Sequence, residues 1–148
     1  MALAGRIRGD DSAARAAFAR ARPEMEKTVL AGPTDGPSLS ILAIIDAGLG
    51  DKGKAVEEAK RACDLSSYTT NNLDATTVHA NLAVVYAWTG ETDLAISELD
   101  ELADRPAASH AMFQVTYGDL DLNPYWDPLR ENPRFQAIMK RLAPVASK

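Results

Sequence analysis

The sequence of 148 residues predicts an all-α protein, built as a solenoid of helical hairpins that ends in a C-terminal capping segment. Two observations carry this prediction. The chain repeats itself at a spacing of about 40 residues, which is typical of solenoids. Every segment between turn signals places its apolar residues at the helical period, and none alternates as a strand would.

The repeated pattern begins at three glycines, Gly9, Gly50 and Gly90. In each copy an acidic residue follows the glycine, an alanine stands five residues after it, and apolar or small residues stand nine and twelve after it. The glycine suits the end of one helix, and the acid suits the N-cap of the next. The pattern therefore predicts antiparallel helical hairpins with very short turns.

The helices are expected in order between Gly, Pro and polar turn signals. Pro23 lies inside the first helix and is expected to kink or restart it. Turns are expected at Asn123-Pro124 and Asp127-Pro128, and Asn132 is expected to cap the last helix. The predicted helices cover residues 12–30, 39–49, 51–66, 75–89, 92–104, 109–120 and, after Asn132-Pro133, the stripe from Phe135 to Leu142.

Composition limits the classes of partner. The net charge of −5 argues against nucleic acid, which needs clustered basic residues. Residues 91–104 hold six acidic and no basic side chains, which fits either a solvated helix face or a docking surface for a basic partner. No run of 18 apolar residues is present, so no membrane partner is expected. The single cysteine, Cys63, suits a reducing compartment, and we expect a cytoplasmic protein.

The repeats resemble tetratricopeptide (TPR) repeats. The third copy matches that motif with Leu82-Ala83, Tyr86, Gly90-Glu91, Ala95 and Leu99. The second copy has Asp46 where the motif has an aromatic residue. The period exceeds the 34 residues of a standard TPR, so by length alone armadillo or HEAT repeats also fit. The resemblance implies one TPR-like domain over residues 1–148, with a partial repeat at about 10–31, repeats at about 37–66 and 74–104, and a capping hairpin at about 107–143.

The segment from Leu122 to Phe135 is similar to the ending of TPR arms in bacterial signalling proteins. Such arms follow winged-helix, adenylate-cyclase-type or serine/threonine-kinase-type domains. The resemblance implies a structural cap, and burial of a tryptophan in it agrees with the need to cover the last repeat. The cap residues are Trp126, Asp127, Pro128, Leu129, Arg130 and Phe135.

The candidate binding site is the concave wall that the first helix of each repeat lines in TPR proteins. The small, mildly apolar wall suits a helix or an extended peptide, and it lacks the basic residues of a carboxylate clamp. Ile44 and Val84 fit packing equally well, and Trp88 fits either packing or a binding anchor. The wall residues are Ser40, Ile44, Ala47, Thr77, Ala80, Asn81, Val84 and Trp88.

No catalytic set, metal site or cofactor motif is evident in the sequence. His79 and His110 have no second ligand at metal spacing, and Asp119 and Asp121 lack the rest of a calcium loop. We therefore expect a non-catalytic module that binds a protein or peptide, with no cofactor.

Two alternatives remain open. One is an arm that senses a small ligand or peptide and regulates an attached enzyme or DNA-binding domain. The other is a free-standing adaptor that forms a homodimer through its N-terminal helix. That helix has no complete partner before it and is expected to expose its apolar stripe. Either the native chain continues upstream or this helix packs against another subunit, and the family resemblance favours the first.

Overall fold

The computed structural model describes residues 11–66, 72–105 and 115–144, and within these ranges every regular element is a helix. The all-α prediction is therefore confirmed for the described part of the chain. The elements are α2 (Asp11–Ala31), α3 (Gly36–Leu49), α4 (Lys52–Leu65), α5 (Asn72–Thr89), α6 (Thr92–Ala103), α7 (Tyr117–Leu122), the 3₁₀ helix η1 (Pro124–Leu129) and α8 (Pro133–Leu142).

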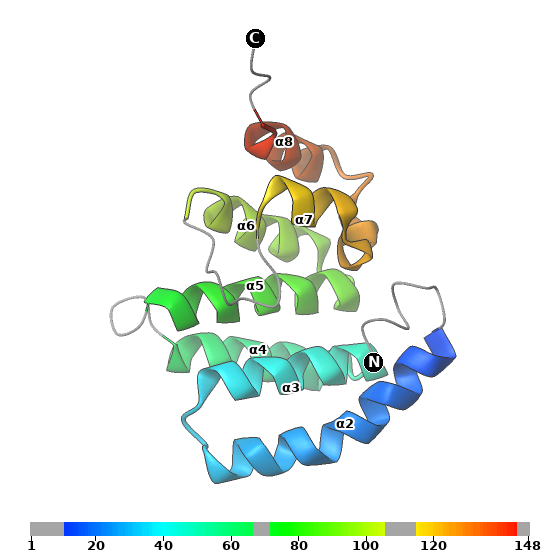
Figure 1. Ribbon diagram of the computed structural model, residues 1–148, viewed down its shortest axis with the longest axis vertical. Helices are drawn as coiled ribbons and strands as arrows, with labels where there is room; N and C mark the ends of the chain where they lie inside the picture. The colour runs from blue at the N-terminus through cyan, green and yellow to red at the C-terminus, as the bar shows by residue number, and fades with distance from the viewer. Residues whose placement is uncertain (1–10, 67–71, 106–114, 145–148) are drawn as a thin grey trace.

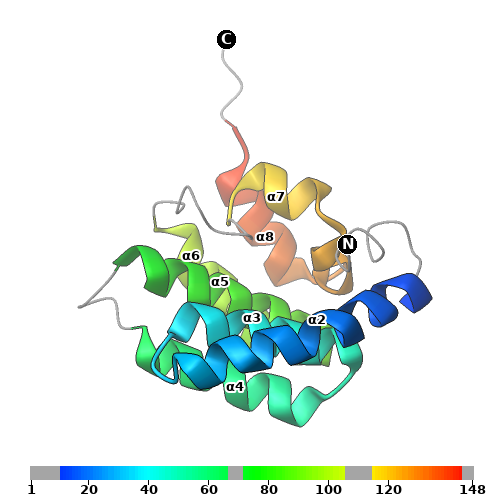
Figure 2. The same ribbon diagram turned by 60° about the horizontal axis from the view of Figure 1, so that its bottom comes forward.

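The helices stack in chain order along the long axis of the molecule, from α2 at one end to α8 at the other (Figure 1). α2 packs on α3, α3 pairs with α4, and α5 packs on both before pairing with α6. η1 and α8 then cover α5 and α6. Figure 2 shows the same order with the α2 end turned toward the viewer. The buried apolar residues of the described ranges form three clusters along the stack, which the partly buried Met25, Cys63 and Trp88 link to one another.

The two hairpin turns have the same geometry. Gly50 and Gly90 have φ values of 89° and 87°, in the left-handed region that a side chain disfavours. The following amides donate backwards, from Asp51 N to Asp46 O at 3.0 Å and from Glu91 N to Tyr86 O at 2.9 Å. These bonds satisfy carbonyls at the end of each first helix. The repeated Gly-acid pair thus reverses the chain in the same way twice.

Pro23 neither ends nor restarts the first helix, because α2 runs through it from Asp11 to Ala31. The predicted restart of the helix at this residue was therefore wrong, and the predicted kink stays a prediction. The Pro23 side chain lies on the exposed face of α2, so its ring meets solvent and not a neighbouring helix. A proline still removes one main-chain hydrogen bond, and the contacts of α2 with α3 outweigh this loss.

The C-terminal region differs from the predicted turns. Residues Pro124–Leu129 form one 3₁₀ helix, in which Asn123 caps the start by accepting from Tyr125 N at 3.2 Å. Pro124 suits the first turn, where an amide donor has no helical partner. The cap predicted at Asn132 is confirmed, since its Oδ1 accepts from Arg134 N at 2.9 Å. Of the helix predicted at 109–120, residues 109–114 lie outside the described residues, and α7 begins at Tyr117.

The apolar stripe of the N-terminal helix is covered and not exposed. Ala14 and Phe18 are buried, Met25 is partly buried, and all three pack with α3 residues such as Ile45. Ala21, which follows Phe18 at the helical period, is exposed. The expectation of an open stripe on this helix was wrong, because α2 lays its apolar side directly on the following helix.

Candidate functional site

The predicted concave wall is packed and not open. Ile44, Ala47, Ala80 and Val84 are all buried and belong to the largest core cluster. Thr77 and Trp88 keep partial exposure. Six of the eight wall residues, counting Ser40 and Asn81, therefore have no surface to offer a partner in this conformation.

The two buried polar residues of the wall form a hydrogen bond between α3 and α5. Asn81 Nδ2 donates to Ser40 Oγ at 2.8 Å, and Ser40 Oγ donates to Pro37 O at 2.7 Å. Asn81 Oδ1 is buried without a hydrogen-bond partner. This pair joins the first helices of the two repeats, and it serves the packing of the wall.

Trp88 serves packing between distant parts of the chain. Its Nε1 donates to Tyr125 O at 3.1 Å, and its ring meets Tyr125 edge-on at a centroid distance of 5.8 Å. Phe18 of α2 meets the same indole at 6.2 Å. T-shaped contacts of this kind are favourable beyond the area they bury. The packing interpretation of Trp88 therefore has direct support from the structure.

The C-terminal cap is built around Trp126, which is wholly buried. Its Nε1 donates to Asp119 Oδ2 at 3.0 Å, so burial leaves the indole donor satisfied. Leu129 and Phe135 are buried in the same core cluster. Asp127 and Pro128 of the predicted cap are exposed on its surface.

Arg130 ties the cap together through its guanidinium. It pairs with Asp127 Oδ1 at 2.6 Å and donates to the carbonyl oxygens of Leu120 and Asn123, both at 3.1 Å. The guanidinium makes one ion pair and two hydrogen bonds to the backbone. One side chain thus fixes the end of α7 against η1.

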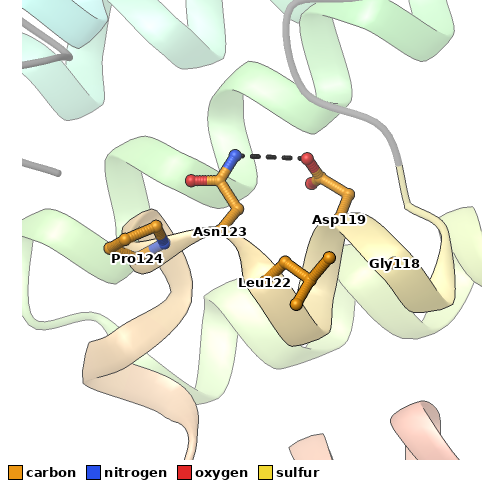
Figure 3. Close-up of a pocket in the computed structure, with 5 residues that line it drawn as sticks. All are labelled: Gly118, Asp119, Leu122, Asn123 and Pro124. Carbon is orange, nitrogen blue, oxygen red and sulfur yellow. Dashed lines mark hydrogen bonds between the residues drawn. The ribbon is translucent and has the colours of Figure 1, made fainter.

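A shallow pocket of about 310 Å³ lies beside the cap (Figure 3). Gly118, Asp119, Leu122, Asn123 and Pro124 line it, and Leu122 is 78% exposed. Both Asp119 oxygens are engaged, one by Trp126 and the other by Asn123 Nδ2 at 3.2 Å. The pocket therefore combines an exposed leucine with a carboxylate that is already used in the structure.

The acidic segment 91–104 meets basic residues of the same chain. Arg134 of α8 lies 3.3 Å from Asp93, and Arg141 lies 2.9 Å from Asp100 and 3.9 Å from Asp104. The basic partner that its charge suggested is thus supplied in part by α8. These pairs are exposed, so each contributes little to stability.

A buried ionic cluster at the junction of α2, α3 and α4 was missed in the sequence. Asp46, with 2% of its side chain exposed, receives Arg22 Nε on Oδ1 at 2.6 Å and Arg22 NH2 on Oδ2 at 3.2 Å. Lys54 Nζ lies 3.3 Å from Asp46 and 3.6 Å from Glu58. The hydrogen bond to Asp46 is the main cause that raises the pKa of Arg22.

A comparison of the repeat copies in the sequence would have indicated this cluster. Arg22, Asp46 and Glu58 stand at the same repeat positions as Cys63, Tyr86 and Glu98. Asp46 stands where the next copy has the aromatic Tyr86, and Arg22 stands where the next copy has Cys63. An acidic and a basic residue that replace uncharged ones at two repeat positions indicate an ion pair. At the second junction Glu98 instead pairs with His79 at 2.9 Å.

The thiol of Cys63 is held in an unreactive setting. Burial, with smaller effects of Glu98 and Asp64, raises the pKa of the Cys63 thiol to about 12, so the thiolate is strongly disfavoured. Within the ranges described, no three His, Cys, Asp or Glu side chains gather as metal ligands. His110 lies outside the described residues.

A search of the described helices for a membrane span finds none with the length and apolar character required to cross a bilayer. Comparisons of the chain with known protein families, with curated proteins and with solved structures each return no match.

Proposed function

We propose that this chain is a TPR-type repeat module that binds a protein partner without catalysis, as part of a bacterial signalling or regulatory protein. The observation that carries the proposal is the repetition of one hairpin in three dimensions. The turns at Gly50 and Gly90 share their backbone geometry, and Ala55 and Ala95, five residues later, are both fully buried. The similarity of the sequence from Leu122 onward to signalling arms supports the assignment to that class.

Stacked hairpins of this kind suit binding more than chemistry. Each hairpin buries its faces against its neighbours, so the outward faces of successive helices form a long, rigid surface. Rigid surfaces lose little conformational entropy when a partner docks. Of the side chains with reactive chemistry, Cys63 packs against the core, and His79 is paired with Glu98 within the α5–α6 hairpin.

Because the inner wall is packed, the proposed binding surface is the outward faces of α2, α4 and α6. Arg20, Lys60 and Glu101 are exposed on these three helices. Thr77 marks the one described position of the predicted wall, other than Trp88, that keeps partial exposure. These four positions sample the outer and the inner surface of the stack.

Site-specific photocrosslinking of the native polypeptide in its source cell tests the proposal. A photoreactive residue at Arg20, Lys60 or Glu101 should yield one discrete protein adduct, identified by mass spectrometry. A charge reversal beside the reactive position should abolish the adduct while circular dichroism stays unchanged. An adduct formed only at Thr77 would move the binding surface back to the inner wall. Four positions without any discrete adduct would contradict the binding function.

The intact mass of the endogenous polypeptide tests the signalling assignment separately. A mass well above 15.9 kDa would show that this region is one part of a larger protein. A mass near 15.9 kDa would contradict the arm and would favour a free-standing adaptor.

A further inference from the structure

Glu58 of α4 is a carboxyl group buried without adequate partners. Only 13% of its side chain is exposed, and its Oε2 is buried with no hydrogen-bond donor. Its one cationic neighbour within 4.0 Å among the described residues is Lys54, at 3.6 Å from Oε1. A buried carboxylate oxygen without a donor is costly, whereas a protonated carboxyl carries no net charge to solvate.

The negative charge of the neighbouring Asp46 disfavours ionisation of Glu58. Asp46 forms ion pairs with both Arg22 and Lys54, so Lys54 is shared between the two acids Asp46 and Glu58. Of the two acids, Asp46 has the closer and better-bonded cations. The ionised form of Glu58 is therefore less well stabilised than that of Asp46.

We propose that the junction of α2 with the α3–α4 hairpin is a proton-responsive joint, which loosens when Glu58 gives up its proton as the pH rises toward neutrality. The carboxylate formed there is unsolvated at Oε2 and stands beside Asp46. Opening the junction admits water, which solvates Glu58 and screens it from Asp46. Opening also removes Arg22, whose charge favours the carboxylate, so the joint loosens because solvation of Glu58 outweighs the loss of this cation. This inference concerns the stability of the joint and does not depend on the proposed binding function.

The charged groups around Glu58 come from three helices. α2 supplies Arg22 and Glu26, which pair at 3.1 Å, α3 supplies Asp46, and α4 itself supplies Lys54. Burial, followed by the charge of Asp46, raises the pKa of Glu58 to about 7, against the lowering effects of Lys54 and Arg22. The raised pKa shows that burial and Asp46 together outweigh the two cations.

α5 also packs against α4, and its titratable side chains are Asp74, His79 and Tyr86. His79 is paired with Glu98 of the following junction. The pKa of Tyr86 is raised by burial and then by Glu98, Cys63 and Glu91. His79 and Tyr86 thus belong to the electrostatic surroundings of the second junction.

α2 is the element expected to move. Of its 21 residues only Ala14, Ala17 and Phe18 are buried, and its main packing partner is α3. Helices with few buried contacts open locally at lower cost than the rest of a fold. α6, with four buried residues in 12, serves as an internal reference.

Amide hydrogen exchange of the full chain between pH 5.5 and 7.5 tests the joint, with rates corrected for the intrinsic effect of pH. Linkage of one proton predicts that the protection factors of α2 fall roughly ten-fold over this range, while those of α6 change much less. Glu58→Gln, which keeps the neutral shape, should remove the fall. Glu57→Gln, the exposed neighbour on the same helix, should leave it intact.

The proposal is overturned if α2 protection does not change with pH, or if the Glu58→Gln and Glu57→Gln variants behave alike. A carbon-detected titration of Glu58 in the unmodified protein gives a second test that needs no variant. A midpoint near 7 supports the joint, and a midpoint near the ordinary value of 4.5 refutes it.

Discussion

The phenyl ring of Phe18 occupies the space that a side chain on Gly48 would fill. A Cβ atom placed on Gly48 would lie 2.5 Å from Cε2 and 2.6 Å from Cδ2 of that ring. Gly48 is therefore required for close approach between α2 and α3 and not for an unusual backbone conformation. Through this contact Phe18 also reaches Trp88, so one glycine sets how the first helix sits on the stack.

Gly48→Ala should destabilise the protein by roughly 1–3 kcal/mol, because an inserted methyl overpacks the α2–α3 contact. Gly53→Ala is the matched control, since a Cβ at Gly53 meets no atom within 4 Å. The control should be neutral or stabilising by up to about 1 kcal/mol, because alanine favours helix. Urea unfolding measures both changes, and equal midpoints would contradict the close approach.

Trp126→Ala should lower the stability of the whole stack by roughly 3–5 kcal/mol, because a wholly buried indole is lost from a shared core. Trp126→Phe keeps much of the ring but loses the bond to Asp119, and should cost about 1 kcal/mol from that bond in addition to any packing loss. Thermal unfolding followed by circular dichroism tests this. An unchanged melting temperature in Trp126→Ala would disprove the capping role.

Arg22 and Asp46 should be energetically coupled. Arg22→Met leaves the buried carboxylate of Asp46 with Lys54 alone, and a loss of roughly 1.5–3 kcal/mol is expected. Combining it with Asp46→Asn should cost less than the sum of the two single changes, by about 1 kcal/mol or more.

The exposed pair of Arg134 and Asp93 provides the control cycle for this coupling. Its side chains are 58% and 88% exposed, so its coupling energy should be below about 1 kcal/mol. Both cycles are read from urea unfolding at one pH. Additive losses at Arg22 and Asp46 would show that their close geometry contributes no specific stability.

The pH dependence of global unfolding should follow Glu58. Its pKa is raised to about 7 in the folded protein from an ordinary 4.5, so the neutral form is favoured by folding. The stabilisation is complete below the unfolded value and is lost as the pH rises through the folded value. The free energy of unfolding should fall by about 1–3 kcal/mol between pH 4.5 and 7.5 from this group.

Glu58→Gln should remove that part of the pH dependence. His79→Gln is the matched control, because His79 pairs with Glu98 at the equivalent second junction and should leave the Glu58 contribution in place. Guanidinium unfolding across the pH range separates the two. A pH profile that Glu58→Gln leaves unchanged would assign the dependence to other groups.

Features that depend on a few neighbouring residues could be predicted from the sequence. Helical periodicity predicted the helices, the Gly-acid pairs predicted the turns at Gly50 and Gly90, and Asn132 predicted its cap. These are local preferences, because a cap or a left-handed turn is satisfied within one turn of helix. The burial of Trp126 was also readable, since so large an apolar side chain rarely stays exposed next to a terminal repeat.

What covers each helix could not be predicted in this way, because it depends on contacts between segments that are distant in the sequence. Periodicity shows that Ile44 and Val84 share a face but not that this face is packed shut. Arg22 and Asp46 are 24 residues apart, so their pairing depends on how α2 lies on α3. The continuity of α2 through Pro23 likewise depends on packing with α3. In each case the outcome is a balance of burial and desolvation between distant segments, which local sequence does not contain.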